Sequence, residues 1–168
     1  MAENNEHQKA RKKFRDRLDN AWVFRFFLFT KMPIALLAGL YVRRFDEKGA
    51  TVSVPFKWLS QNPFKSVYFA TQAMAAEMST GLPAMAAIQG YHPGISMLVT
   101  NIEAEFVKKA NQRVYFSCDD GDLLTKHVSE TVAAGEGRVI KIKSVGRLKD
   151  GTIVSTFHVT WSFKQKQR

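Results

Sequence analysis

The chain has 168 residues, a length that suits one globular domain with one hydrophobic core. Its 45% hydrophobic and 24% charged residues are ordinary for a folded protein and exclude intrinsic disorder. The formal net charge of +10 lies mostly at the two ends, because residues 1–31 contribute +4 and the last five residues contribute +3. Such ends suit nucleic acid, a membrane surface or a phosphate-bearing ligand, or they serve solubility alone.

Cysteine content and the apolar stretches narrow the class of protein further. The single cysteine, Cys118, excludes an intramolecular disulfide and a cysteine-cluster zinc site. It lies in an apolar-alternating run, which predicts a small buried side chain rather than a nucleophile. The two apolar stretches, residues 21–29 and 32–40, are each too short to span a bilayer, and the first residues are polar. A cytoplasmic location is therefore expected.

The N-terminal pattern predicts a helix over residues 3–31. Phe14, Leu18 and Trp22 recur at helical spacing among charged residues. The last part of this helix, residues 22–29, is apolar nearly all round. This favours burial against the rest of the chain or a second subunit, and contact with a membrane surface is the alternative because basic residues flank it.

Strand-like patterns fill most of the remaining chain. Alternating apolar and polar residues predict two strands before a central helix and four after it. These strands are expected over residues 40–46, 51–58, 96–107, 112–118, 137–148 and 152–164, with a short helix over 122–133. The last two strands meet at Asp150-Gly151, a dipeptide typical of a tight hairpin. The predicted core face of the last strand carries Ile153, Phe157, Val159, Trp161 and Phe163.

A central helix over residues 64–82 carries one isolated charge. Pro63 precedes this helix, and Pro83 is expected to end or kink it. Several alanines leave little side-chain bulk, so a sheet can approach closely. Glu77 stands alone in the apolar stretch. A lone carboxylate under a sheet must be exposed, paired or functional, because burying it without a partner is costly.

Three methionines, Met74, Met78 and Met85, share one face of this helix if it continues past the proline. Such a stripe is usually core, but flexible thioether side chains also suit a pocket for acyl chains. No cofactor is expected, because the sequence lacks the nucleotide-binding and serine-hydrolase motifs. No metal is expected either, since the histidines and the acidic run at residues 119–122 lack the spacing of metal ligands.

The order of two strands, a long helix and four strands resembles the hotdog fold. In this α+β fold an antiparallel sheet of about five to six strands wraps around a central helix. The resemblance covers roughly residues 32–163, within an expected hotdog domain of residues 32–168 that follows an N-terminal helical extension of residues 1–31. The stretch from Asn62 to Glu77 resembles the helix-start motif of acyl-CoA thioesterases of the phenylacetate-pathway type.

That motif places an Asn six residues before a His-Gly-Gly and an acidic residue nine after the His. Asn62, Tyr68 and Glu77 keep these spacings. The chain is also similar to a bacterial family of uncharacterised, thioesterase-like hotdog domains. The shared sequence is Asn-Pro-Phe, Tyr-Phe and Ala-Glu around the helix, and Phe-His-Val-Thr-Trp in the last strand.

The resemblance implies a hydrolase that acts on acyl-CoA or acyl-carrier thioesters. Glu77 would be the general base or nucleophile, and Asn62 would position water or substrate. Backbone N–H groups near Phe69 and Ala70 would form the oxyanion hole, since a helix N-terminus offers unpaired donors. A carboxylate on an apolar helix is also expected to have a raised pKa. The implied substrate contacts come from Ser66, Tyr68, Phe69, Ala70, Met74, Thr80 and Gly81.

The resemblance also implies a site between two subunits, hence a homodimer or a tetramer. In one departure, Tyr68-Phe69-Ala70 replaces His-Gly-Gly, and glycine is what lets a thioester carbonyl lie close to the backbone. Phe69 either fills that space or points into the core. The alternative function is a non-catalytic acyl- or lipid-binding module of the same fold. Nucleic-acid binding through the basic ends ranks last, because no aromatic-basic recognition motif accompanies the charge.

Overall fold

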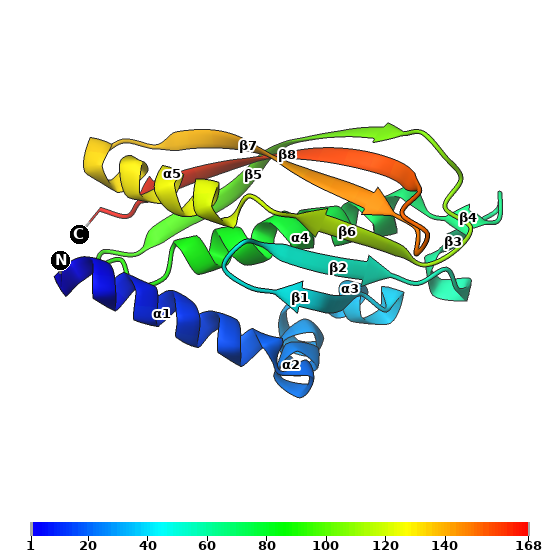
Figure 1. The fold of residues 1–168 in the computed structure, drawn as a ribbon, viewed down its shortest axis with the longest axis horizontal. Helices are drawn as coiled ribbons and strands as arrows, with labels where there is room; N and C mark the ends of the chain where they lie inside the picture. The colour runs from blue at the N-terminus through cyan, green and yellow to red at the C-terminus, as the bar shows by residue number, and fades with distance from the viewer. Residues whose placement is uncertain (1, 168) are drawn as a thin grey trace.

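Six antiparallel strands form one sheet in the computed structural model, which describes residues 2–167 (Figure 1). The strands are β1 (Tyr41–Phe45), β2 (Ala50–Val54), β5 (Ile95–Phe106), β6 (Val114–Cys118), β7 (Arg138–Arg147) and β8 (Ile153–Gln165), in the order β1-β2-β6-β7-β8-β5. A separate hairpin pairs β3 (Gln61–Asn62) with β4 (Ser66–Val67). The helices are α1 (Ala2–Asp19), α2 (Ala21–Lys31), α3 (Pro33–Ala38), α4 (Phe69–Ala87) and α5 (Gly121–Ala134), with a 3₁₀ turn at Trp58–Ser60. The α+β class and the central helix, α4, are confirmed.

Helix α4 is held against the sheet by small side chains and buried hydrogen bonds. The alanines of its inner face are buried, and the helix packs on β2, β6 and β7. Side-chain hydrogen bonds also join the helix to the sheet. The Ser79 and Ser144 hydroxyls lie 2.7 Å apart, and Ser155 Oγ donates to Gln72 Oε1 at 2.9 Å. Buried polar groups that are paired in this way fix one position of the helix on the sheet.

The predicted boundaries of the central helix are wrong at both ends, since the helix spans Phe69–Ala87 rather than residues 64–82. At its start, Asn62 Oδ1 accepts the backbone N–H of Ser66 at 3.2 Å, which helps close the β3–β4 hairpin. At its end, Pro83 does not stop the helix. A proline removes one backbone hydrogen bond, but the residues around this one are buried, and their packing outweighs the loss.

The predicted helix over residues 3–31 is two helices, and an unexpected third one follows. Asn20 separates the first two, because its backbone is extended (φ −70°, ψ 114°) and its Oδ1 accepts the N–H of Trp22 at 3.0 Å. Helix α3 begins at Pro33 and is followed by Gly39, whose φ of 81° lies in the left-handed region. The N-terminal helices share the core of the domain.

Burial of residues 22–29 is confirmed for only one face of α2. Phe24 and Leu28 are buried in the core that also contains α4. The opposite face is exposed, with Trp22 at 82%, Phe26 at 68% and Phe29 at 66%. No helix among residues 2–167 is both long enough and apolar enough to cross a membrane.

The remaining strands and α5 lie close to their predicted positions, although the second strand already ends at Val54. The core face of β8 differs from the prediction at its start. Ile153 is 41% exposed and Val154 is buried, because the pairing of β7 with β8 is irregular between Gly146 and Arg147. The other residues predicted for this face are buried.

Candidate active site

Glu77 borders a small cavity between several elements of the fold. The cavity has a volume of about 100 Å³, and α2, α4, β5 and β8 contribute to its walls. The lining side chains are Phe27, Met32, Glu77, Met78, Gly81, Leu82, Met85, Met97 and Trp161. No other residue in this lining carries a charge, so Glu77 faces an apolar space.

The Glu77 carboxylate is only partly accessible and has no charged partner. Among residues 2–167, none of the ion pairs involves this carboxylate. Burial therefore raises the pKa of Glu77 above its ordinary value. A raised pKa brings a carboxylate closer to the range in which it works as a general base.

Gly81 makes room for this carboxylate. A Cβ atom at Gly81 would lie 3.3 Å from Glu77 Oε1 and 3.3 Å from Cζ2 of Trp161. Trp161 Nε1 donates to Thr80 Oγ1 at 3.0 Å, and Thr80 Oγ1 in turn donates to the Glu77 carbonyl at 2.9 Å. Thr80 is thus buried, positions a wall of the cavity and does not itself line the cavity.

Three of the predicted residues around the start of α4 line a different depression, and Tyr68 and Ala70 do not. This depression has a volume of about 430 Å³ and is lined by Asn62, Ser66 and Phe69 together with the end of β5. Asn62 Oδ1 accepts the backbone N–H groups of Phe64 at 3.1 Å and Ser66 at 3.2 Å, so its oxygen shapes the hairpin and its amide N–H₂ is left to donate. In one chain Asn62 and Glu77 do not share a cavity.

The N-terminus of α4 offers backbone donors. The Tyr68 carbonyl accepts the N–H groups of Thr71 at 3.0 Å and Gln72 at 3.1 Å. The N–H groups of Phe69 and Ala70 have no hydrogen-bond partner within the part of the chain that the structure describes. Two adjacent donors at a helix start are the geometry that an oxyanion hole requires.

The Phe69 side chain points outward and borders the depression next to these donors. It is 57% exposed, and its ring lies 4.7 Å from the ring of Tyr68, which is 42% exposed. Of the two alternatives for Phe69, insertion into the core is therefore wrong.

The two groups of predicted residues are separated along α4. Glu77 follows Phe69 by eight residues, which corresponds to about 12 Å at the rise of an α-helix. One thioester carbonyl cannot contact both positions in a single chain. Met74 lies between them, packs against the core and lines neither space.

The sheet face beside these groups is left uncovered by the chain. Strand β5 is an edge of the sheet. Its residues Ile102 and Phe106 are 44% and 49% exposed, although their neighbours on β8, Val159 and Phe157, are buried. An exposed apolar sheet edge of this kind is typical of an interaction surface.

The sequence patterns do not identify the residues of other elements that enclose Glu77. Phe27, Met32 and Met97 belong to no motif of the helix start, and the alternation of the last strand predicts only a core position for Trp161. The apolar character of residues 22–29 was the one available signal for Phe27. Contacts between segments this far apart are set by tertiary packing, which periodicity does not report.

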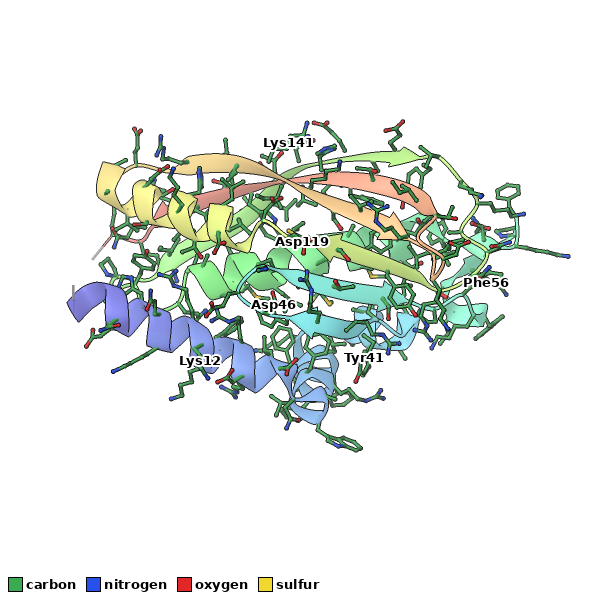
Figure 2. All side chains as sticks on the ribbon, in the orientation of Figure 1. Lys12, Tyr41, Asp46, Phe56, Asp119 and Lys141 are labelled. Atoms are coloured by element: carbon green, nitrogen blue, oxygen red, sulfur yellow. The ribbon has the colours of Figure 1, made fainter. Side chains whose placement is uncertain are left out.

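Asp46 and Asp119 lie in the loops after β1 and β6 (Figure 2). Arg44 forms ion pairs with both of them. The Asp119 side chain is 68% exposed. A solvated turn over residues 119–122 is wrong for the last two residues, because α5 begins at Gly121, which is buried. Within residues 2–167, no group of three or more His, Cys, Asp or Glu side chains could hold a metal ion. Nearby Cys118 is buried as predicted, and burial raises the pKa of its thiol to about 12.

The sequence matches a known protein family over most of its length. A profile described as a domain of unknown function, DUF4442, covers residues 20–163. The chain belongs to the DUF4442 family. No curated protein matches this DUF4442 chain in sequence.

Solved structures resemble the DUF4442 domain in fold. A Pseudomonas aeruginosa protein named as a probable thioesterase gives a TM-score of 0.70 at 14% identity, over 84% of this chain and 93% of its own. A Chlorobaculum tepidum protein of unknown function gives a TM-score of 0.72 at 14% identity, over 95% of this chain and 96% of its own. A Haemophilus influenzae thioesterase gives a TM-score of 0.61 at 11% identity, over 87% of this chain and 91% of its own. These likenesses confirm a thioesterase-like hotdog fold, and at such identities they show the fold alone.

Proposed function

We propose that the chain hydrolyses acyl thioesters of CoA or of an acyl carrier, at a site that a second copy completes. The observation that carries this proposal is the unpaired Glu77 carboxylate in an apolar cavity. The apolar walls would hold the acyl group, since methionine side chains adapt to ligands of different shape. The spacing of Asn62, Tyr68 and Glu77, which matches that of phenylacetate-pathway-type thioesterases, supports CoA as the thiol.

In the proposed reaction Glu77 acts as a general base. Its carboxylate accepts a proton from water, the resulting hydroxide adds to the thioester carbon, and the carbonyl oxygen takes up the negative charge. Collapse of the tetrahedral intermediate expels the thiolate, which takes the proton back from Glu77. The products are a carboxylic acid and a free thiol. Direct attack by Glu77 would instead form a mixed anhydride, whose hydrolysis could place labelled solvent oxygen in Glu77.

A second copy would supply the donors for the negative charge. Because Phe69 and Glu77 lie about 12 Å apart along one helix, both can act on one carbonyl only if they come from different chains. Two α4 helices related by a two-fold axis and running in opposite directions would bring the N-terminus of each near Glu77 of the other. The unpaired N–H groups of Phe69 and Ala70 support this role.

The uncovered edge of β5 is the surface expected to hold the two copies together. Ile102 and Phe106 present apolar side chains there, and the edge strand has unpaired backbone groups. Pairing of β5 with its symmetry mate would satisfy those groups and bury the apolar residues. The same surface leads to the start of α4, because Phe106 and Phe69 line one depression.

Hydrolysis of a panel of acyl-CoAs tests the proposal. The Glu77→Gln variant keeps the shape of the side chain but cannot accept the proton, so kcat should fall on the order of a hundredfold or more. Glu136→Gln, at an exposed glutamate in the α5–β7 loop, is the matched control and should retain full activity. Equal rates for wild type and E77Q would refute the role of Glu77.

A non-catalytic acyl-binding module is the second candidate. The specific observation that favours it is Tyr68-Phe69-Ala70, where the related motif has His-Gly-Gly, because the Phe69 ring borders the space next to the oxyanion donors. Mass spectrometry of the purified protein would then find a retained acyl compound, and no thioester of the panel would be turned over. Turnover of any acyl-CoA that depends on Glu77 would exclude this alternative.

A further inference from the structure

A group of exposed apolar side chains lies on α2 and on α3, the helix that follows it and packs against it. We name it the α2–α3 patch; its residues are exposed by between 62% and 82% and are Trp22, Phe26, Phe29, Ile34 and Leu37. In Figure 1, α2 lies at the lower edge of the molecule, on the opposite side from β7 and β8. Bulky apolar side chains at this exposure mark an interaction site when they are grouped.

Basic side chains predominate beside the α2–α3 patch, although the exposed Asp19 precedes α2. Arg25 lies on the exposed stripe of α2 between Trp22 and Phe29, and Lys31 ends the helix. From Asn20 to Phe45 the chain has four basic side chains and no acidic one. The surface thus combines apolar rings with positive charge, a combination that complements a membrane whose headgroups are negative.

An apolar cavity opens beside the patch. It lies between α1 and α2 and has a volume of about 360 Å³. Its walls include Phe14, Leu18 and Phe26 of the two helices, with Arg17 and Lys31 among the lining residues. Phe27 lines this cavity and also the Glu77 cavity, so one aromatic ring borders both. The Phe27 side chain therefore separates the cavity beside the patch from the Glu77 cavity.

We propose that the α2–α3 patch docks onto a membrane surface that contains anionic phospholipids. The Trp22 and Phe29 rings would insert at the level of the headgroups, while Arg25 and Lys31 would contact lipid phosphates. A second copy of the chain fits the patch less well, because a two-fold contact there would bring basic side chains together. Docking needs neither Glu77 nor the proposed hydrolysis.

Co-sedimentation with vesicles tests this proposal on the full chain. One set of vesicles contains phosphatidylcholine alone, and the other contains phosphatidylcholine with phosphatidylglycerol. Wild type should sediment with the anionic vesicles and largely remain in solution with the neutral ones. Trp22→Gln with Phe29→Gln should lower the partition coefficient about tenfold or more. Arg25→Gln with Lys31→Gln should lower it about fivefold for each lost charge.

Val139→Gln is the matched control, because Val139 is 60% exposed on β7, away from the patch. It should bind as wild type does. Circular dichroism melting curves check that each variant is folded. If W22Q/F29Q does not fold, R25Q/K31Q still tests the proposal. Absence of vesicle binding by wild type, or unchanged binding by both double variants, would overturn the proposal. The proposal would also be overturned if wild type self-associates and W22Q/F29Q does not, because the patch would then join two copies of the chain.

Discussion

The two halves of α4 are built from similar residues but meet very different surroundings. From Met78 to Ala87 nearly every side chain is buried, including polar Ser79 and Thr80. From Phe69 to Glu77 only one side of the helix is buried, and the other side carries exposed or partly exposed residues. The second half is complete within one chain, whereas the first half has an open side.

This difference coincides with the position of the candidate catalytic groups. The unpaired N–H donors, the Phe69 ring and Glu77 all lie on the half of α4 that the chain leaves partly uncovered. The open edge of β5 faces the same region with apolar residues. A helix that served only as core would be covered along its whole length, so the uncovered half is where a partner is expected to bind.

Truncation of one side chain in each half gives the largest expected effect. Leu82→Ala removes a side chain that is 1% exposed, so the free energy of unfolding should fall by about 2–5 kcal/mol. Met74→Ala, in the partly uncovered half, should cost clearly less, because its side chain retains access to solvent. Urea unfolding of both variants measures the two losses. Equal losses would contradict the comparison.

A charge on the open side should act on association instead. Ile102→Lys places an ammonium group on the exposed apolar edge, and the dissociation constant of the dimer should rise on the order of thirtyfold or more. Leu98→Lys is the control, because Leu98 is 66% exposed on the same strand but pairs with Ser162, on the other face of the sheet. Sedimentation velocity measures both. A monomeric wild type, or a dimer that I102K leaves intact, would refute this interface.

Much of the fold follows from local patterns. The Asp150-Gly151 turn, the long C-terminal hairpin and α5 could be predicted because their signals lie within a few adjacent residues. The boundaries of α4 could not, since the Asn62 side chain closes a hairpin where a helix start was expected. The effect of Pro83 could not be predicted locally either, because burial of its neighbours outweighs the lost hydrogen bond.

The candidate site, too, could be predicted from the sequence only in part. Glu77 stands out in the sequence as the one charge in an apolar helix, and it has no ionic partner among residues 2–167. The wall formed by Phe27, Met97 and Trp161 depends on how α2, β5 and β8 meet α4, and no local pattern encodes that meeting. The irregular pairing of β7 with β8 likewise changed which residues of β8 face inward.

The pH dependence of stability should separate Glu77 from a glutamate with the opposite shift. Burial raises the pKa of Glu77 above 4.5, so its contribution to stability is present below that pH and is lost as the pH rises through the raised value. E77Q should therefore gain stability relative to wild type as the pH increases. The pH dependence of kcat should report the same group. Because catalysis requires the Glu77 carboxylate, kcat should rise as the pH increases through the pKa of Glu77.

Glu103 supplies the control for that measurement. Lys141 lies on the outer side of the sheet (Figure 2). Its Nζ donates to Glu103 Oε2 at 2.6 Å, and this hydrogen bond lowers the pKa of Glu103. Its contribution to stability is present above the ordinary pKa of a glutamate and is lost as the pH falls through the lowered one. Glu103→Gln should thus differ from wild type in the opposite direction in urea unfolding at several pH values. The same trend in both variants would rule out burial of Glu77 as the cause.

The smallest expected effect concerns the start of α4. Phe69→Ala removes an exposed ring and places a better helix former at the first helical position, so stability should change by less than about 1 kcal/mol. If the ring restricts access to the backbone donors, its removal should raise kcat/KM for bulky acyl-CoAs severalfold. Tyr68→Ala, which removes the neighbouring ring, serves as the comparison because Tyr68 does not line the depression. An unchanged kcat/KM in F69A, with a clear loss in Y68A, would instead assign substrate contact to the tyrosine.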